Sequence, residues 1–114
     1  MEVINKKLWK KWRILINRVL ENNNLKVTIS DAGAELISVW DKSRNAERIW
    51  RGDSAVWGRH APILFPFVGK VAGGKYSYRG REYKMTSHGF ARDRQFELVS
   101  EDGESVTHVL RWNE

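Results

Sequence analysis

Residues 25–30, LKVTIS, alternate apolar and polar side chains. Successive side chains of a β-strand point to opposite faces of its sheet, so this period of two predicts a strand with one buried face. Residues 31–33, DAG, follow directly and are typical of a turn. Residues 34–40 are rich in aliphatic and aromatic side chains and predict a second strand.

The same pattern continues along the rest of the chain. A short strand is expected at 48–50, a hairpin at 76–83 around an Arg-Gly turn, and a second hairpin from 95–100 and 105–112 around an Asp-Gly turn. Residues 61–69, APILFPFVG, contain two prolines, which exclude a helix interior or a central strand and favour an edge strand or a wall-forming loop. The spacing predicts one all-β domain of the sandwich or barrel kind.

The N-terminal segment has a different period. Residues 6–20 place apolar side chains at helical spacing with Lys and Arg between them, which predicts an amphipathic helix with a basic face. We therefore divide the chain into a basic N-terminal extension, 1–18, and a β domain, 19–114. Three possibilities stay open: a helix packed against its own domain, an extension that is not well folded, or contact of residues 1–20 with a membrane surface or a partner.

Charge is unevenly distributed. Residues 1–18 hold six basic residues and one acidic residue, whereas residues 19–114 hold 14 basic and 13 acidic residues. The body of the protein is thus electrostatically balanced, which argues against nucleic acid as its partner. The chain has no cysteine, no apolar run of transmembrane length and no signal-peptide pattern, so a cytoplasmic protein without disulfides is expected.

Three histidines are candidates for chemistry, and their contexts differ. His108 lies inside a strand pattern and is expected to be structural or on the surface, while His60 lies in a loop wall and could touch a ligand or be structural. His88 precedes a glycine and is followed by Phe90 and Arg92. Aromatic faces cover the apolar side of a pyranose, and imidazole and guanidinium donors satisfy its oxygens, so this cluster fits a sugar site. A satisfied loop histidine beside a solvated turn is the alternative.

Other chemistries find no support in the sequence. The histidines are widely spaced and have no clustered carboxylate pair, so no metal site is expected. The chain also lacks a phosphate-binding P-loop and a nucleophile elbow. We expect no cofactor.

Several motifs, in one order along the chain, resemble the opening third of bacterial aldose 1-epimerase-like proteins, nearest to the LacX-type branch. The resemblance extends over residues 19 to 100. It is carried by Leu20-Glu21-Asn22, Leu25-Lys26-Val27-Thr28-Ile29-Ser30, Gly33-Ala34-Glu35-Leu36, Ile49-Trp50, Gly52-Asp53, Trp57, Ala61-Pro62-Ile63-Leu64-Phe65-Pro66, Gly69 and His88-Gly89-Phe90-Ala91-Arg92.

The resemblance implies a galactose mutarotase-like β-sandwich that binds a monosaccharide and interconverts its α and β anomers by acid/base ring opening without a cofactor. His88 matches the first active-site histidine. Arg92 matches the motif arginine, which in related hexose-phosphate epimerases helps to bind an anionic substituent. Lys70 falls where many members have an arginine that hydrogen-bonds the sugar, and a lysine offers a point charge in place of a fork. Phe90 completes the expected substrate-binding set. Which hexose is bound, and whether it is phosphorylated, stays open.

Length separates this chain from the family. The resemblance places a second histidine, a substrate aspartate and a glutamate base beyond residue 114, so an incomplete fragment of an epimerase is expected. The alternative is a non-catalytic carbohydrate-binding β domain. Hairpins without their partner strands would expose sheet edges and tryptophans, which predicts self-association.

Overall fold

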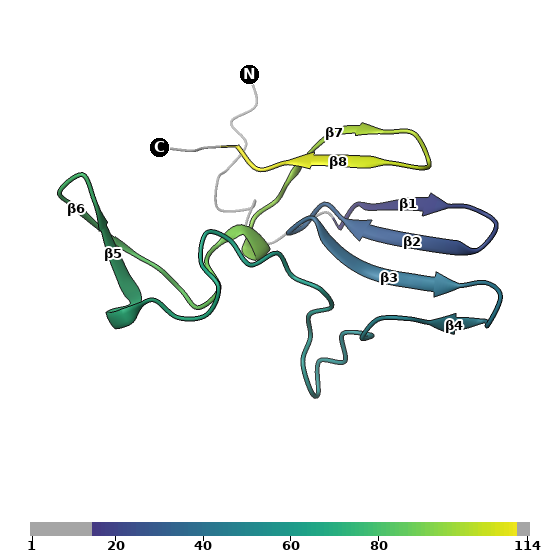
Figure 1. Cartoon of the computed structure of the whole chain (residues 1–114), viewed down its shortest axis with the longest axis horizontal. Coiled ribbons are helices and arrows are strands. Elements are labelled where there is room, and N and C mark those ends of the chain that lie inside the picture. Colours follow the sequence, from purple (N-terminus) through teal and green to yellow (C-terminus); the bar gives the residue numbers. More distant parts are fainter. Residues whose placement is uncertain (1–14, 112–114) are drawn as a thin grey trace, which may run out of the picture.

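The computed structural model of the chain describes residues 15–111. Four strands form an antiparallel sheet in the order β1-β2-β3-β4 (Figure 1). The strands span β1 Asn17–Glu21, β2 Leu25–Ser30, β3 Glu35–Asp41 and β4 Ala46–Glu47. The predictions of strands at 25–30 and 34–40 are confirmed, since β2 and β3 occupy these stretches.

The strand β1 corrects the prediction of a helix over residues 6–20. Residues 17–20 belong to β1, and residues 6–14 lie outside the described part of the chain. The cause is the turn that follows: the side-chain oxygen of Asn22 accepts the backbone N–H groups of Asn24 and Leu25, both at 2.8 Å. This turn folds β1 back onto β2 with Leu20 opposite Val27, and sheet pairing overrides the helical spacing.

At the other edge of the sheet, the strand predicted at 48–50 is wrong, because β4 is two residues long and ends at Glu47. The Glu47 carboxylate accepts the Val39 backbone N–H at 2.7 Å and the Ser38 hydroxyl at 2.6 Å. The Glu47 side chain thus occupies the Val39 N–H, which a longer β4 would have bound through its backbone. Although burial raises the pKa of Glu47, these hydrogen bonds outweigh it and leave that pKa below its ordinary value.

Two hairpins complete the described fold, and both were predicted from sequence. The first joins β5 Lys75–Tyr78 to β6 Arg81–Lys84, and the second joins β7 Glu97–Glu101 to β8 Val106–Val109. Figure 1 shows the β5–β6 hairpin projecting away from the sheet, while β7–β8 lies beside β1. Two short 3₁₀ turns, Ala72–Gly74 and Ala91–Asp93, lie in the connections. Residues 15–111 contain no helix long and apolar enough to cross a membrane.

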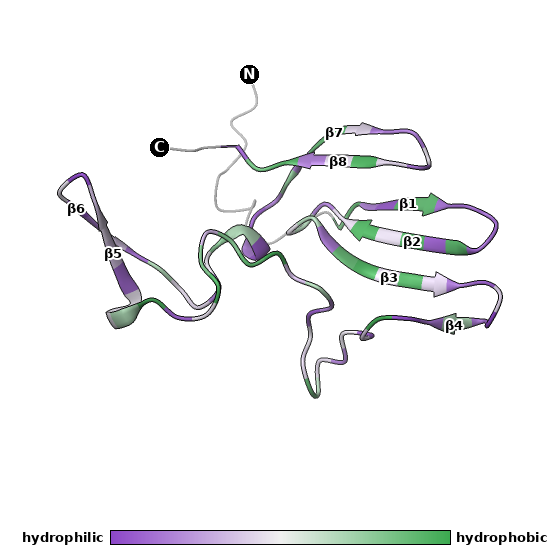
Figure 2. Cartoon of the chain, viewed as in Figure 1, coloured by the Kyte–Doolittle hydropathy of each residue, from purple (hydrophilic) through white to green (hydrophobic). Residues whose placement is uncertain are grey.

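The interior of this assembly is small. Figure 2 shows apolar segments in β1, β2, β3 and β8 interrupted by polar ones, as expected for strands with one buried face. Within the described range, however, Ala91 is the sole hydrophobic residue that is fully buried. The apolar side chains of the sheet, such as Val27 and Leu36, are half-buried. The sheet therefore has an apolar face that these residues cover only in part.

Candidate functional site

The site begins where two loops are joined by backbone hydrogen bonds. The carbonyl oxygen of Phe65 accepts the N–H groups of Phe90 at 3.0 Å and of Ala91 at 3.2 Å. Gly89 lies against the same carbonyl in the left-handed region, at φ +74°, and a Cβ there would overlap the Phe65 backbone. Glycine is thus required by both conformation and space, which explains the glycine after His88. The proline-containing loop 61–69 is therefore a fixed wall against the His88 loop.

His88 is held to this wall by a reciprocal pair of hydrogen bonds with Gly69. The His88 backbone N–H donates to the Gly69 carbonyl at 2.7 Å, and the Gly69 N–H donates to Nδ1 of the His88 ring at 3.0 Å. His88 itself has φ +66°, a conformation that non-glycine residues seldom adopt. A strained backbone persists where its surroundings impose it and often marks a functional position.

The hydrogen bond from Gly69 also fixes the protonation pattern of the imidazole. A backbone N–H can only donate, so Nδ1 of His88 must accept and carries no proton. In the neutral ring the proton then lies on Nε2. No hydrogen-bond partner of Nε2 is found among residues 15–111, so the His88 ring presents a free N–H donor.

Lys70 directly follows Gly69, the glycine that is hydrogen-bonded to His88. Its side chain is exposed and lines a cavity of about 290 Å³ together with Ser87, the residue before His88. Lys70 and His88 thus lie in adjoining loops joined by the Gly69–His88 hydrogen bonds, but His88 itself is not among the residues that line this cavity.

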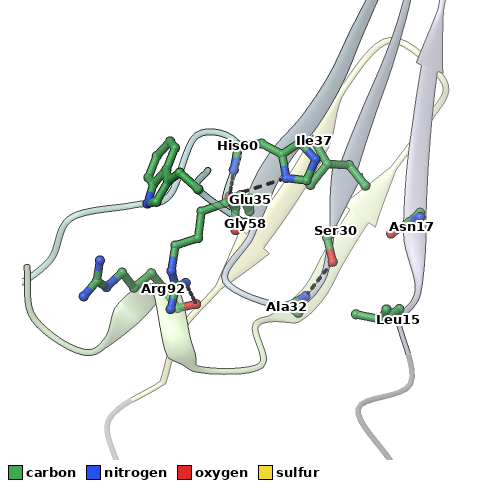
Figure 3. A pocket seen from close by; sticks show the side chains of 11 residues that line it. Leu15, Asn17, Ser30, Ala32, Glu35, Ile37, Gly58, His60 and Arg92 are labelled. Carbon is green, nitrogen blue, oxygen red and sulfur yellow. Dashed lines mark hydrogen bonds and ion pairs between the residues drawn. The ribbon is translucent and has the colours of Figure 1, made fainter. Parts of the chain in front are cut away.

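Arg92 faces a different space. It lines an open cavity of about 630 Å³ between loop residues and the sheet, where Gly58 and His60 lie on the loop side and Ser30 and Ile37 on the strands (Figure 3). Its guanidinium Nη2 donates to the Ser87 carbonyl at 2.7 Å, and its Nε is buried with no partner in the described part of the chain. Arg92 thus stabilises the position of Ser87, the residue before His88.

Glu35 organises the far wall of that cavity, and sequence analysis did not single it out. Its buried carboxylate oxygen accepts the backbone N–H groups of His60 at 2.6 Å and Ala61 at 3.1 Å. The His60 ring packs over Gly52, where a Cβ would stand 2.5 Å from its Cε1 atom. These contacts give His60 a structural role in anchoring the loop, and its alternative role as a ligand contact stays a prediction.

Phe90 lies at a third position. Its ring meets Phe65 edge to face, with ring centres 6.3 Å apart, and the Arg94 guanidinium lies 5.8 Å from its centre. Phe90 is 37% exposed and lines a cavity of about 390 Å³ with Arg94. Arg92, Phe90 and Lys70 thus line three different cavities, and backbone contacts connect each of their positions to the His88 loop.

His108 has the structural role expected of it. Its Nε2 lies 2.8 Å from Asp31 Oδ1, and the His108 side chain is 7% exposed. Arg18 binds the same carboxylate through two nitrogens, at 3.0 and 2.7 Å. The Arg18 guanidinium and, to a lesser extent, the His108 hydrogen bond hold the pKa of Asp31 below its ordinary value although burial raises it. This cluster, Arg18–Asp31–His108, joins β1 and the β2–β3 turn to β8.

Residues 15–111 contain no group of three or more His, Asp or Glu side chains placed to hold a metal ion. The arrangement they do offer is a fixed imidazole donor at the Gly69–His88 pair, suited to hydrogen-bonding a polar ligand. His88, Lys70 and Arg92 stay predicted site residues. Sequence reasoning gave no site role to Gly69 and Glu35, the two residues that hold the neighbouring loops in place. The sequence signal for both residues was their place in the motifs that carry the family resemblance.

Comparisons with solved structures define the class of fold. The structure is similar to a galactose mutarotase related enzyme from Lactobacillus acidophilus, with a TM-score of 0.83 and 43% identity, over 87% of this chain and 33% of the other. It is also similar to a galactose mutarotase-like protein from Lactobacillus casei, with a TM-score of 0.81 and 40% identity, over 86% of this chain and 33% of the other. The fold is therefore mutarotase-like.

The family follows from sequence. The family model described as aldose 1-epimerase matches residues 18–114, and the chain belongs to the aldose 1-epimerase family. Protein LacX (plasmid) of Lactococcus lactis subsp. lactis is 33% identical over a 99-residue alignment, and the match covers 82% of this chain and 33% of the relative. The chain thus spans about a third of the length of the curated relatives it matches. The predicted resemblance is confirmed.

Proposed function

We propose that this chain forms one wall of a monosaccharide site in a protein of the aldose 1-epimerase type. The observation that carries the proposal is the clasp between Gly69 and His88, which fixes a strained imidazole with its Nε2–H left as a donor. Pyranose oxygens lose water on binding and need such donors in return. Family membership supports a sugar as the ligand.

The proposed chemistry is interconversion of the α and β anomers of a hexose. Ring opening requires a base to take the proton of the anomeric hydroxyl and an acid to protonate the ring oxygen, after which the aldehyde rotates and the ring recloses. With its proton on Nε2, neutral His88 donates to a sugar oxygen and is unsuited to be the base. Lys70 is the proposed second donor, while Phe90, which lines a separate cavity with Arg94, stays a prediction as a sugar contact.

We assign the opposing proton-transfer group to the part of the family fold that this chain does not match. Arg92 acts on the site through Ser87, whose carbonyl it holds at 2.7 Å, and its buried Nε retains an unused donor. A phosphate on the sugar would give this guanidinium a direct partner. The division into a 1–18 extension and a β domain 19–114 stays a prediction, and its boundary lies inside β1. A cytoplasmic location is also part of the proposal.

Calorimetry with glucose and galactose tests the binding site. His88→Ala and Lys70→Ala should each weaken binding about threefold to tenfold, the loss of one net hydrogen bond. Lys26→Ala is the matched control, because Lys26 is exposed on β2 and should leave affinity unchanged. Arg92→Ala should weaken binding through the displaced loop. Unchanged affinity in all three variants, at His88, Lys70 and Arg92, would refute the assignment of the sugar site.

Polarimetry of freshly dissolved α-glucose or α-galactose tests the reaction. Acceleration over buffer that falls in His88→Ala supports an epimerase. Hexose binding without acceleration removes the enzymatic claim for residues 1–114 and leaves carbohydrate binding as the function.

A further inference from the structure

Thr86 closes the turn that carries His88. The N–H group of Gly89 donates to the Thr86 carbonyl at 3.0 Å, and the Thr86 hydroxyl donates to the Gly89 carbonyl at 3.1 Å. Two hydrogen bonds of opposite direction therefore join the two ends of the segment 86–89. The backbone of Ser87 and His88, the residues between these ends, follows the course that the two bonds impose.

His88 occupies the position in this turn that glycine usually takes. Of the two central residues of the turn, only His88 has a positive φ, at +66°. Positive φ at the third residue is the mark of a type II turn, which favours glycine there because a side chain is strained in the left-handed region. Such a conformation persists only where the surrounding contacts impose it. The Thr86–Gly89 pair spans the strained residue directly.

Both ends of the turn are also held by other segments. Met85, the residue before Thr86, donates its N–H to the Gly74 carbonyl at 2.8 Å. Gly89 is buried and pairs with Phe65 in an isolated parallel bridge. Thr86 itself is exposed, so a substitution there disturbs no packed interior. The hydroxyl can therefore be removed while these backbone contacts stay in place.

The conformation of the turn decides where the imidazole ring lies. The His88 backbone N–H and the His88 ring nitrogen Nδ1 are both hydrogen-bonded to Gly69, at 2.7 and 3.0 Å. A change of φ at His88 from +66° to a negative value turns its side chain relative to its own N–H group, so the two bonds to Gly69 cannot both persist. The closed turn thus keeps Nδ1 on Gly69 and Nε2–H in one direction.

We infer that Thr86 is a positioning residue for His88, and that its hydroxyl locks the turn 86–89 in the conformation that fixes the imidazole. Thr86 acts through His88 and needs no contact with the sugar. The step from ring geometry to sugar affinity rests on the proposed function of His88. A ligand binds only those molecules in which its donor is in place, so a turn that opens part of the time lowers the apparent affinity in proportion.

Two substitutions at position 86 isolate the hydroxyl. Thr86→Val removes the hydroxyl and keeps the branched shape of the side chain, whereas Thr86→Ser keeps the hydroxyl and removes a methyl group. Thr107→Val makes the first of these changes at an exposed position of β8 and is the matched control. Circular dichroism checks the fold of each variant before the comparison.

The ¹⁵N signals of the His88 ring and amide hydrogen exchange report the geometry without any ligand. In Thr86→Val, Nδ1 should lose part of the shift of a hydrogen-bonded acceptor. Exchange at the Gly69 and Gly89 amides should become about twofold to tenfold faster, which corresponds to the loss of one net hydrogen bond. Calorimetry with glucose and galactose should show binding weakened by the same factor. Thr86→Ser and Thr107→Val should match the unchanged protein in all three measurements.

The inference is overturned if the His88 ring signals of Thr86→Val equal those of the unchanged protein, or if Thr86→Ser shows the same changes as Thr86→Val. Hexose affinity that is equal in Thr86→Val and the unchanged protein overturns it as well. One measurement needs no variant: a Gly89 amide that exchanges without protection in the unchanged protein shows that the turn is open. If the ring responds as expected but the unchanged protein binds no hexose, the proposed function fails and the positioning of His88 by Thr86 stands.

Discussion

Replacing Asp31 by alanine removes the carboxylate that joins the sheet to the β7–β8 hairpin. Asp31 is 4% exposed and accepts two hydrogen bonds from Arg18, while His108 lies 2.8 Å from the same carboxylate. The Asp31 backbone is hydrogen-bonded to two other segments as well. Its N–H donates to the Ile16 carbonyl, and its carbonyl accepts the N–H of Phe96. The side chain is thus the charged centre of a junction between three segments.

The size of the effect follows from burial. Breaking a buried ion pair by removing one partner costs about 3–5 kcal/mol, and an exposed pair costs about 0–1 kcal/mol. The Arg18 side chain is 19% exposed, and its guanidinium has a second carboxylate partner, Glu101, at 3.2 Å. We therefore expect Asp31→Ala to lower the free energy of unfolding by about 3 kcal/mol, near the lower end of the buried range. For a domain of this length the Tm should fall by on the order of 10 °C or more.

Urea unfolding followed by circular dichroism, with a thermal scan, measures both quantities. Glu97→Ala is the control, because it removes the carboxylate of a Glu97–Arg111 pair in which both side chains are more than half exposed. Its unfolding curve should nearly overlay that of the unchanged protein. If Asp31→Ala unfolds at the same urea concentration as Glu97→Ala, the cluster does not hold the hairpin to the sheet.

Three further predictions concern the loops and pH. Gly89→Ala should destabilise the protein by at least about 1 kcal/mol, because a side chain is strained at φ +74° and overlaps Phe65; an unchanged Tm would contradict this. Glu35→Ala should speed hydrogen exchange at the His60 amide, which loses its acceptor, and equal exchange would refute the anchoring role. Asp31 has a lowered pKa when folded, so its stabilisation is complete above its unfolded pKa of about 4 and is lost as the pH falls through the folded value. Urea midpoints should therefore drop in acid, and less so in Asp31→Ala, whereas identical acid profiles would contradict the assignment.

How much of this fold could be predicted depends on how local its causes are. The strand at 25–30 and the two hairpins follow from alternation and turn residues, which act within a few positions. The strand β1 escaped prediction because its apolar residues also fit a helical period. Its decisive feature is the Asn22 side chain, which closes the turn onto β2. The asparagines at 22–24 were the available signal.

The candidate site divides in the same way. Gly89, next to His88, indicated an unusual backbone conformation in the sequence, and both residues have positive φ in the structure. The clasp by Gly69 spans 19 positions and the anchoring of His60 by Glu35 spans 25, so both depend on long-range packing. Single-sequence patterns carry no information about such contacts. They also could not show that Arg92 faces another cavity than Lys70.

The ¹⁵N NMR signals of the His88 ring test the central claim most directly, because they report both the clasp and the ligand. In the labelled protein at neutral pH, Nε2 should carry the proton and Nδ1 should have the shift of a hydrogen-bonded acceptor. Addition of glucose or galactose should move the Nε2 signal in particular. A ring protonated on Nδ1, or one whose signals do not respond to saturating hexose, would contradict the account.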